Sequence, residues 1–200
     1  MKIKTLFIAS LIAGSGVSYG AAGIFDELIW TTTVTPFAYG TSTFFEIDSD
    51  TTNLFGASEF HGASLGSFAL GSQLFLAGQQ KSFKNNSTDV TGHTLFWSLN
   101  GGLTSQSLGY GFQADLGGGD QRWGTDHTGG LTSNILSGLT PGNYTLSVWT
   151  SISTNGTNAD STIFNNRGGA NYNATFTVIP EPTAALLGSL GMLGLLRRRR

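Results

Sequence analysis

Hydrophobic and polar residues alternate along most of the chain between about residues 27 and 179. In the segment 171–179 every second side chain is apolar, which is the pattern of a strand with one face on a core and the other in water. The same two-residue period appears in four other segments. They are 28–34, 95–99, 108–116 and 144–148. No stretch of this region has a helical period, so the pattern predicts an all-β fold.

Turn-forming residues separate these expected strands. Clusters rich in Asn, Asp, Ser and Gly, such as "NNSTD", "LGGGDQ", "TNGTNAD" and "NNRGG", fall between them, and Pro141-Gly142 lies one residue before the segment 144–148. Turns at these intervals are typical of two antiparallel sheets packed face to face. We therefore expect an antiparallel β-sandwich of about 8–10 strands, of the jelly-roll or immunoglobulin-like type.

The N-terminal residues 1–20 have the layout of a secretory signal peptide. Two lysines come first, an apolar stretch follows, and small residues stand at Ser18 and Gly20. This order predicts cleavage between Gly20 and Ala21, and it implies an export translocon and a signal peptidase as partners. The β domain, residues 21–179, is then exported.

Charge and cysteine content narrow the possible functions of the exported part. Residues 21–179 hold 4 basic and 11 acidic side chains, a formal charge of −7. A nucleic-acid partner is therefore not expected. The chain has no cysteine, which excludes disulfides, thiolate metal sites and cysteine nucleophiles. No pattern in the sequence predicts a cofactor.

The C-terminal segment 180–200 has a different composition. Pro180-Glu181-Pro182 is followed by uncharged residues 183–196 and then by Arg197, Arg198, Arg199 and Arg200. As a helix, the uncharged stretch would be roughly 21 Å long, against about 30 Å for the hydrocarbon core of a bilayer. We expect a short hydrophobic helix that anchors the chain only transiently in the inner membrane, with the arginines on the cytoplasmic side.

Together, these terminal features make the chain resemble the PEP-CTERM proteins of Gram-negative bacteria, with the match covering residues 179–200. The resemblance implies that Pro180, Glu181 and Pro182 form a sorting motif read by exosortase, a membrane processing enzyme, and that Arg197–Arg200 end the signal. It also implies a final location at the cell surface or outside the cell, in association with exopolysaccharide.

The expected function is structural or adhesive, without enzymatic activity. A carbohydrate-binding β-sandwich module is the alternative, because exposed indole rings stack on sugars. Trp30, Trp97 and Trp149 lie in strand-like segments, where packing in the core is expected. Trp123 lies in an expected loop, "GGDQRWGTDH", and is the predicted sugar contact.

Two weaker motifs suggest a hydrolase site and a calcium site. "GASLG" (62–66) matches the nucleophile elbow of hydrolases, with Ser64 as nucleophile and Asp126 and His127 as helpers, although the strand–turn–helix context is missing. Hydrolysis is therefore a distant third hypothesis. Asp48, Asp50 and Glu59 have part of the spacing of a calcium loop, but the loop lacks its glycine, so an acidic solvated loop is favoured over a metal site.

Overall fold

The computed structural model describes most of the β domain and a small part of the tail. The described residues are 22–36, 39–47, 57–85, 88–102, 105–125, 130–155, 161–181, 188 and 190–192. Within them the chain is mostly β, as predicted. The strands are β1 (Ala22–Thr32), β2 (Ser42–Glu46), β3 (Ser58–Glu59), β4 (Ser64–Ala69), β5 (Phe75–Lys84), β6 (Val90–Leu99), β7 (Gln106–Gly117), β8 (Asp120–Gly124), β9 (Gly142–Thr154), β10 (Thr162–Asn165) and β11 (Tyr172–Ile179). Two 3₁₀ turns, η1 (Tyr39–Thr41) and η3 (Arg167–Gly169), connect strands.

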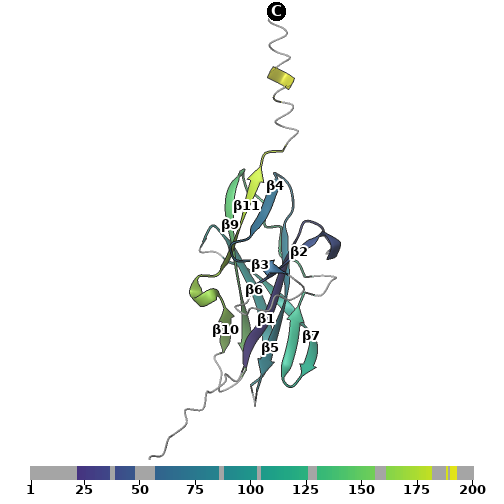
Figure 1. Ribbon diagram of the computed structural model, residues 1–200, viewed down its shortest axis with the longest axis vertical. Coiled ribbons are helices and arrows are strands. Elements are labelled where there is room, and N and C mark those ends of the chain that lie inside the picture. The colour runs from purple at the N-terminus through teal and green to yellow at the C-terminus, as the bar shows by residue number, and fades with distance from the viewer. Residues whose placement is uncertain are drawn as a thin grey trace, which may run out of the picture.

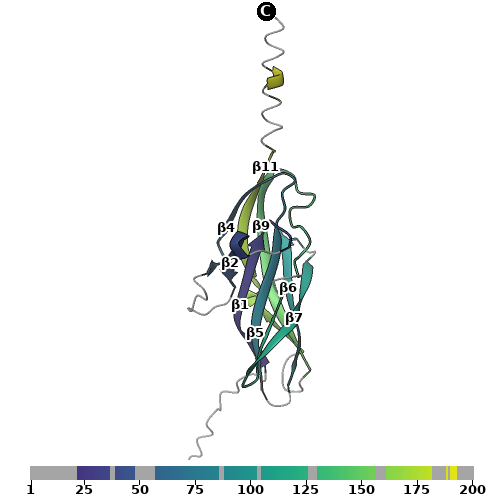
Figure 2. The same ribbon diagram turned by 90° about the vertical axis from the view of Figure 1, so that its right-hand side faces the viewer.

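The strands form one curled sheet in the order β3-β2-β1-β5-β8-β7-β6-β9-β11-β4, with β10 paired to β9. The curl brings β1 and β5 to face β6 and β9, as the two views in Figures 1 and 2 show. Most neighbours are antiparallel, but β2 pairs with β3, and β11 with β4, in parallel. The predicted antiparallel arrangement therefore describes most strand pairs but not these two, and the sheet is mixed. The strand number also exceeds the predicted range, because β3 and β10 are too short to show an alternating pattern.

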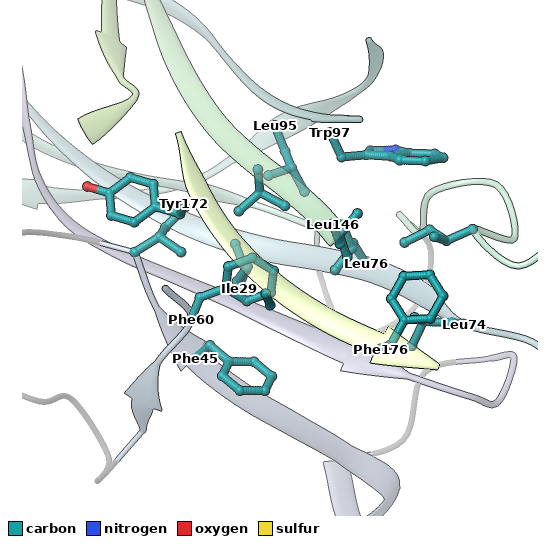
Figure 3. Packing of buried hydrophobic residues seen from close by; sticks show 14 of the residues in the cluster. Ile29, Phe45, Phe60, Leu74, Leu76, Leu95, Trp97, Leu146, Tyr172 and Phe176 are labelled. Carbon is teal, nitrogen blue, oxygen red and sulfur yellow. The ribbon is translucent and has the colours of Figure 1, made fainter. Parts of the chain in front are cut away.

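The core lies inside the curl. Ile29 and Leu76 from one side pack with Leu95, Leu146 and Phe176 from the other, and all five are at most 2% exposed (Figure 3). The alternation predicted for 171–179 is confirmed, since Tyr172, Ala174, Phe176 and Val178 are buried and the polar residues between them are more exposed, although the last residue, Ile179, is 40% exposed. Burying these aliphatic and aromatic side chains contributes about 1.5–3 kcal/mol each.

Strand β7 follows the predicted alternation only at its start. Tyr110 is 5% exposed, whereas Phe112 and Leu116 are 54% and 46% exposed. Its pairing with β8 shifts register twice, after Phe112 and after Asp115. Such bulges turn the strand and break the two-residue period, so the second half of β7 leaves the core.

One end of the interior is polar. Glu27 and Gln80 are fully buried there, close to His93 and Tyr110. Burial lowers the pKa of His93 to about 3. Burial, followed by the nearby charge of Glu27, raises the pKa of Tyr110 well above its usual range. In this environment the imidazole is neutral and the phenol stays protonated at physiological pH.

The tail is described only in part. Residues 188 and 190–192 are helical, but most of the predicted helix 183–196 lies outside the described residues. Across the parts of the chain that are described, no helix has the length and hydrophobicity needed to cross a membrane.

Candidate functional site

The outer face of β9 carries a row of polar side chains. Because a strand alternates, Ser147 faces away from the core that its neighbours Leu146 and Val148 fill. The register places Ser147 opposite Ser98 of β6 on one side and opposite Asn173 of β11 on the other. Three adjacent strands therefore present small hydrogen-bonding side chains in one line.

Two turns form walls on either side of this row. At the end of β6, Asn100 and Gly101 have φ values of 52° and 65°, and the Gly102 N–H donates to the Leu99 carbonyl over 2.9 Å. This is the geometry of a type I′ turn, for which Asn-Gly is a favoured sequence. On the opposite side, the chain leaves η3 through Ala170 and Asn171 before β11 begins.

A groove of about 590 Å³ lies between the turns. Its lining includes Ser98, Asn100, Thr145, Ser147, Trp149 and Asn173, with Gly101, Gly102, Ala170 and Asn171 at the rims. The volume is within the usual range for a small-molecule site. The groove is thus large enough for a ligand of one or a few rings.

Hydrogen bonds fix the side chains that line the groove. Ser147 Oγ donates to Asn173 Oδ1 over 2.6 Å, and Asn173 Nδ2 donates to the Ala170 carbonyl over 3.3 Å. Asn100 Oδ1 accepts the Thr145 N–H over 2.9 Å. Since these amides are already oriented, a ligand that binds them has less side-chain ordering to impose.

Trp149 supplies the large apolar surface of the groove. Phe96 of β6 stacks on its indole, with ring centroids 5.6 Å apart and planes 9° from parallel. The side chain is only partly buried, so the expectation that Trp149 packs in the core is wrong. It lies on the outer face because it follows the inward-facing Val148 by one residue.

A second, smaller hollow of about 340 Å³ adjoins the groove and shares Thr145 with it. Ser64, Asn143, Thr175 and Thr177 contribute its polar lining. Thr177 Oγ1 donates to Asn143 Oδ1 over 2.8 Å. The polar outer face therefore continues along β9 and β11 beyond the groove.

The described lining of both hollows contains no charged side chain. Hydroxyls and amides can donate to and accept from a neutral ligand rich in hydroxyl groups, and the indole can pack on an apolar ring face. Glycoside hydrolysis usually requires a pair of carboxyl groups beside the scissile bond. The described lining of the two hollows includes neither carboxyl group.

The structure changes the position assigned to Trp123. It lies in strand β8 and not in a loop, with His93 stacked on its ring at 4.9 Å and Phe112 against it edge-on at 5.3 Å. Its Nε1–H donates to Gln121 Oε1 over 3.3 Å. Two side chains pack on the Trp123 ring, and Trp123 lines neither hollow, whereas Trp149 has one ring partner, Phe96, and lines the groove, so Trp149 is the stronger candidate for a ligand contact.

The other predicted positions do not come together as a site. Ser64 begins the edge strand β4 and no helix follows it, so the setting of a nucleophile elbow is missing. Asp126 and His127, like the calcium candidates Asp48 and Asp50, lie outside the described residues. Glu59 is exposed on β3. The described part of the chain holds no cluster of three or more acidic, His or Cys side chains suited to a metal ion.

The sorting and processing residues are only partly placed. Pro180 and Glu181 directly follow β11 and are exposed. Gly20, Ala21, Pro182 and Arg197–Arg200 lie outside the described residues, so the signal peptide, its cleavage and the rest of the motif stay predictions.

No protein-family model matches the sequence, and no curated protein matches it. The groove on β9 therefore has to be interpreted from its own residues.

Proposed function

We propose that the β domain is a non-enzymatic, adhesive module of the cell surface that binds neutral polysaccharide in the groove beside Trp149. The observation that carries this proposal is the pairing of a partly exposed indole with a ring of oriented Ser, Thr and Asn side chains. A sugar ring is complementary to this surface, since its apolar face can pack on the indole and its hydroxyls can bond the polar side chains. Indole stacking supplies contact area, and the amides supply orientation.

Charge supports a neutral ligand over an acidic one. The lining of the groove is uncharged, and residues 21–179 carry a formal charge of −7. An acidic polysaccharide would meet this negative field without a basic group in the groove to offset it. We therefore expect neutral glycans to bind and polyuronates not to bind.

The sequence supports the proposed location and route. The predicted signal peptide and the Pro180-Glu181-Pro182 tail support export, transient anchoring in the inner membrane and processing by an exosortase-type enzyme. We further propose that the curled sheet belongs to the jelly-roll or immunoglobulin-like sandwiches. Such folds commonly carry binding sites on an outer face or in end loops.

Binding of soluble neutral and acidic polysaccharides to the full chain tests this function. Trp149→Ala should weaken binding about tenfold or more, because the stacking surface is lost. Trp123→Ala is the matched control and should leave the affinity unchanged, provided that both variants show a cooperative melt. If only Trp123→Ala reduces binding, the groove is the wrong site. If no polysaccharide binds, the adhesive role through sugar is wrong.

A further inference from the structure

The polar end of the interior places a carboxylate, a hydroxyl and an amide in contact. Glu27 on β1 is fully buried, and its Oε2 accepts hydrogen bonds from Thr150 Oγ1 over 2.8 Å and from Gln80 Nε2 over 3.1 Å. Asn165 Nδ2 donates to the same oxygen over 2.8 Å. The same Gln80 amide also donates to Thr150 Oγ1 over 2.8 Å. All three groups Glu27, Gln80 and Thr150 are 0% exposed.

The other end of the Gln80 amide faces a histidine. Because Gln80 Nε2 is directed to Glu27, Oε1 is the atom that meets His93 Nδ1. A carbonyl oxygen can only accept, so His93 Nδ1 carries the proton, and Nε2 accepts from Ser82 Oγ over 3.0 Å. The amide carbonyl is thus held by a donor on the side opposite to the Thr150 hydroxyl.

We propose that Thr150 and Gln80 react within the folded domain to form an intramolecular ester cross-link between β9 and β5. The hydroxyl is the nucleophile, the side-chain amide is the acyl group, Glu27 is the general base and acid, and His93 stabilises the oxyanion. This proposal does not depend on the proposed function, because none of these residues lines the groove.

The reaction balances without any other reactant. After the Gln80 amide plane turns toward Thr150, Oγ1 attacks the Gln80 side-chain carbonyl carbon as Glu27 takes the hydroxyl proton. The tetrahedral oxyanion on Oε1 is stabilised by the His93 Nδ1–H. Glu27 then returns the proton to Nε2, the C–N bond breaks and ammonia leaves. One C–O bond is formed, one C–N bond is lost, and no atom is oxidised or reduced.

The environment favours this reaction over the same reaction in water. Folding holds nucleophile, base and acyl group within hydrogen-bond reach, and such proximity can replace a large part of the entropic barrier. The pair is shielded from solvent, which strengthens the interactions of Glu27 and His93 with the reacting atoms. The bond would join strands that are not neighbours in the sheet but face each other across the interior.

The test is the intact mass of the purified, folded full chain. We expect a mass that is lower than the sequence requires by one molecule of ammonia. Proteolysis should then give one linked peptide pair that contains Gln80 and Thr150, and hydroxylamine should separate it, because esters are cleaved by this nucleophile whereas amides are not. A folded chain with its full mass would overturn the proposal, as would an ammonia loss that maps to another residue.

Variants separate the chemistry from the packing. Thr150→Val and Glu27→Gln should keep the full mass, whereas Thr150→Ser should still lose ammonia because it retains a hydroxyl. Gln79 and Gln113 provide an internal control, since Gln79 Nε2 donates to Gln113 Oε1 over 3.0 Å without a described hydroxyl or carboxylate contact. Both should keep their amides. Ammonia loss at Gln80 in Thr150→Val would contradict the assigned nucleophile.

Discussion

The two faces of β9 carry similar polar residues in opposite environments. Thr150 faces inward and contacts Glu27 and Gln80, in a place that excludes water. Ser147 and Thr145 face outward and line an open groove. Both sets of groups are hydrogen-bonded within the domain, Ser147 to Asn173 on the outer face, but only the outer set borders a groove. Trp149 and Thr150 are adjacent in the sequence, but because side chains alternate along a strand, one lines the outer groove and the other belongs to the buried cluster.

Removing the inner carboxylate should have the largest effect on stability. Glu27→Ala removes the carboxylate that accepts hydrogen bonds from Asn165 and, before the cross-link forms, from Gln80 and Thr150, and it also removes the base that the cross-link needs. We expect a loss of about 3–5 kcal/mol in the free energy of unfolding, measured by urea denaturation. Ser147→Ala is the control on the outer face and should cost only about 1 kcal/mol, because its partner can bind water. Equal losses in the two variants would contradict the difference between the faces.

Two tryptophans on opposite faces give a second comparison. Trp97 is 6% exposed and belongs to the core, so Trp97→Ala should lower the free energy of unfolding by about 3–5 kcal/mol. Trp149→Ala removes the stacking of Phe96 and Trp149 on the outer face, and it should lower the free energy of unfolding by only about 1 kcal/mol. The same variant should reduce glycan binding. Thermal and chemical denaturation of both variants checks this order. A larger loss for Trp149→Ala would mean that its indole is structural.

Two glycines test how tightly the interior is filled. A Cβ at Gly78 would meet the Tyr110 hydroxyl and lie 2.9 Å from the Leu28 carbonyl oxygen, whereas a Cβ at Gly109 would meet nothing within 4 Å. Gly78→Ala should therefore lower the free energy of unfolding by about 1–3 kcal/mol, and Gly109→Ala should leave it nearly unchanged. Melting temperatures of the pair provide the measurement. A neutral Gly78→Ala would show that the interior has room to adjust.

The pH dependence of stability should report on His93. Its pKa is lowered from 6.5 to about 3, so in acid the unfolded chain binds a proton that the folded chain does not bind. The stability that the domain gains from keeping His93 neutral is fully present above pH 6.5, and it is lost as the pH falls toward 3. Between pH 7 and 5 we expect a loss of about 2 kcal/mol. In His93→Gln that loss should disappear. If His93→Gln lost as much stability between pH 7 and 5 as the unmodified domain, titration of other groups would be the cause.

The sequence was sufficient to predict the all-β fold and several strands, because alternation over the segments 95–99, 144–148 and 171–179 reports burial directly. It could not predict the parallel pairings of β3 and β4, since pairing direction depends on contacts between distant segments. Bulges in β7 likewise have no simple sequence pattern, and the alternation over 108–116 does not predict that Phe112 and Leu116 are exposed.

The sequence did not predict where the candidate groove lies. The sequence pattern places Trp123 in a loop and Trp149 in a strand, and therefore favours Trp123 as the sugar contact. The sequence did contain a usable signal, because the residues at 145, 147 and 149 alternate with the apolar 144, 146 and 148. The contributions of Asn100 and Asn173 could not be foreseen, since the register of three strands brings them to the same groove.

Strand β11 ends at Ile179, immediately before Pro180 and Glu181, and it is bonded to β9 on one side and to β4 on the other. A pull on the chain at residue 181 would run along the axis of β11, across its interstrand hydrogen bonds, so these bonds would be loaded together in shear and not opened one at a time. Strand β9, which holds the groove, is the direct neighbour. Because Asn173 of β11 also lines the groove, tension between a bound ligand and the tail would reach β11 both directly and through its interface with β9.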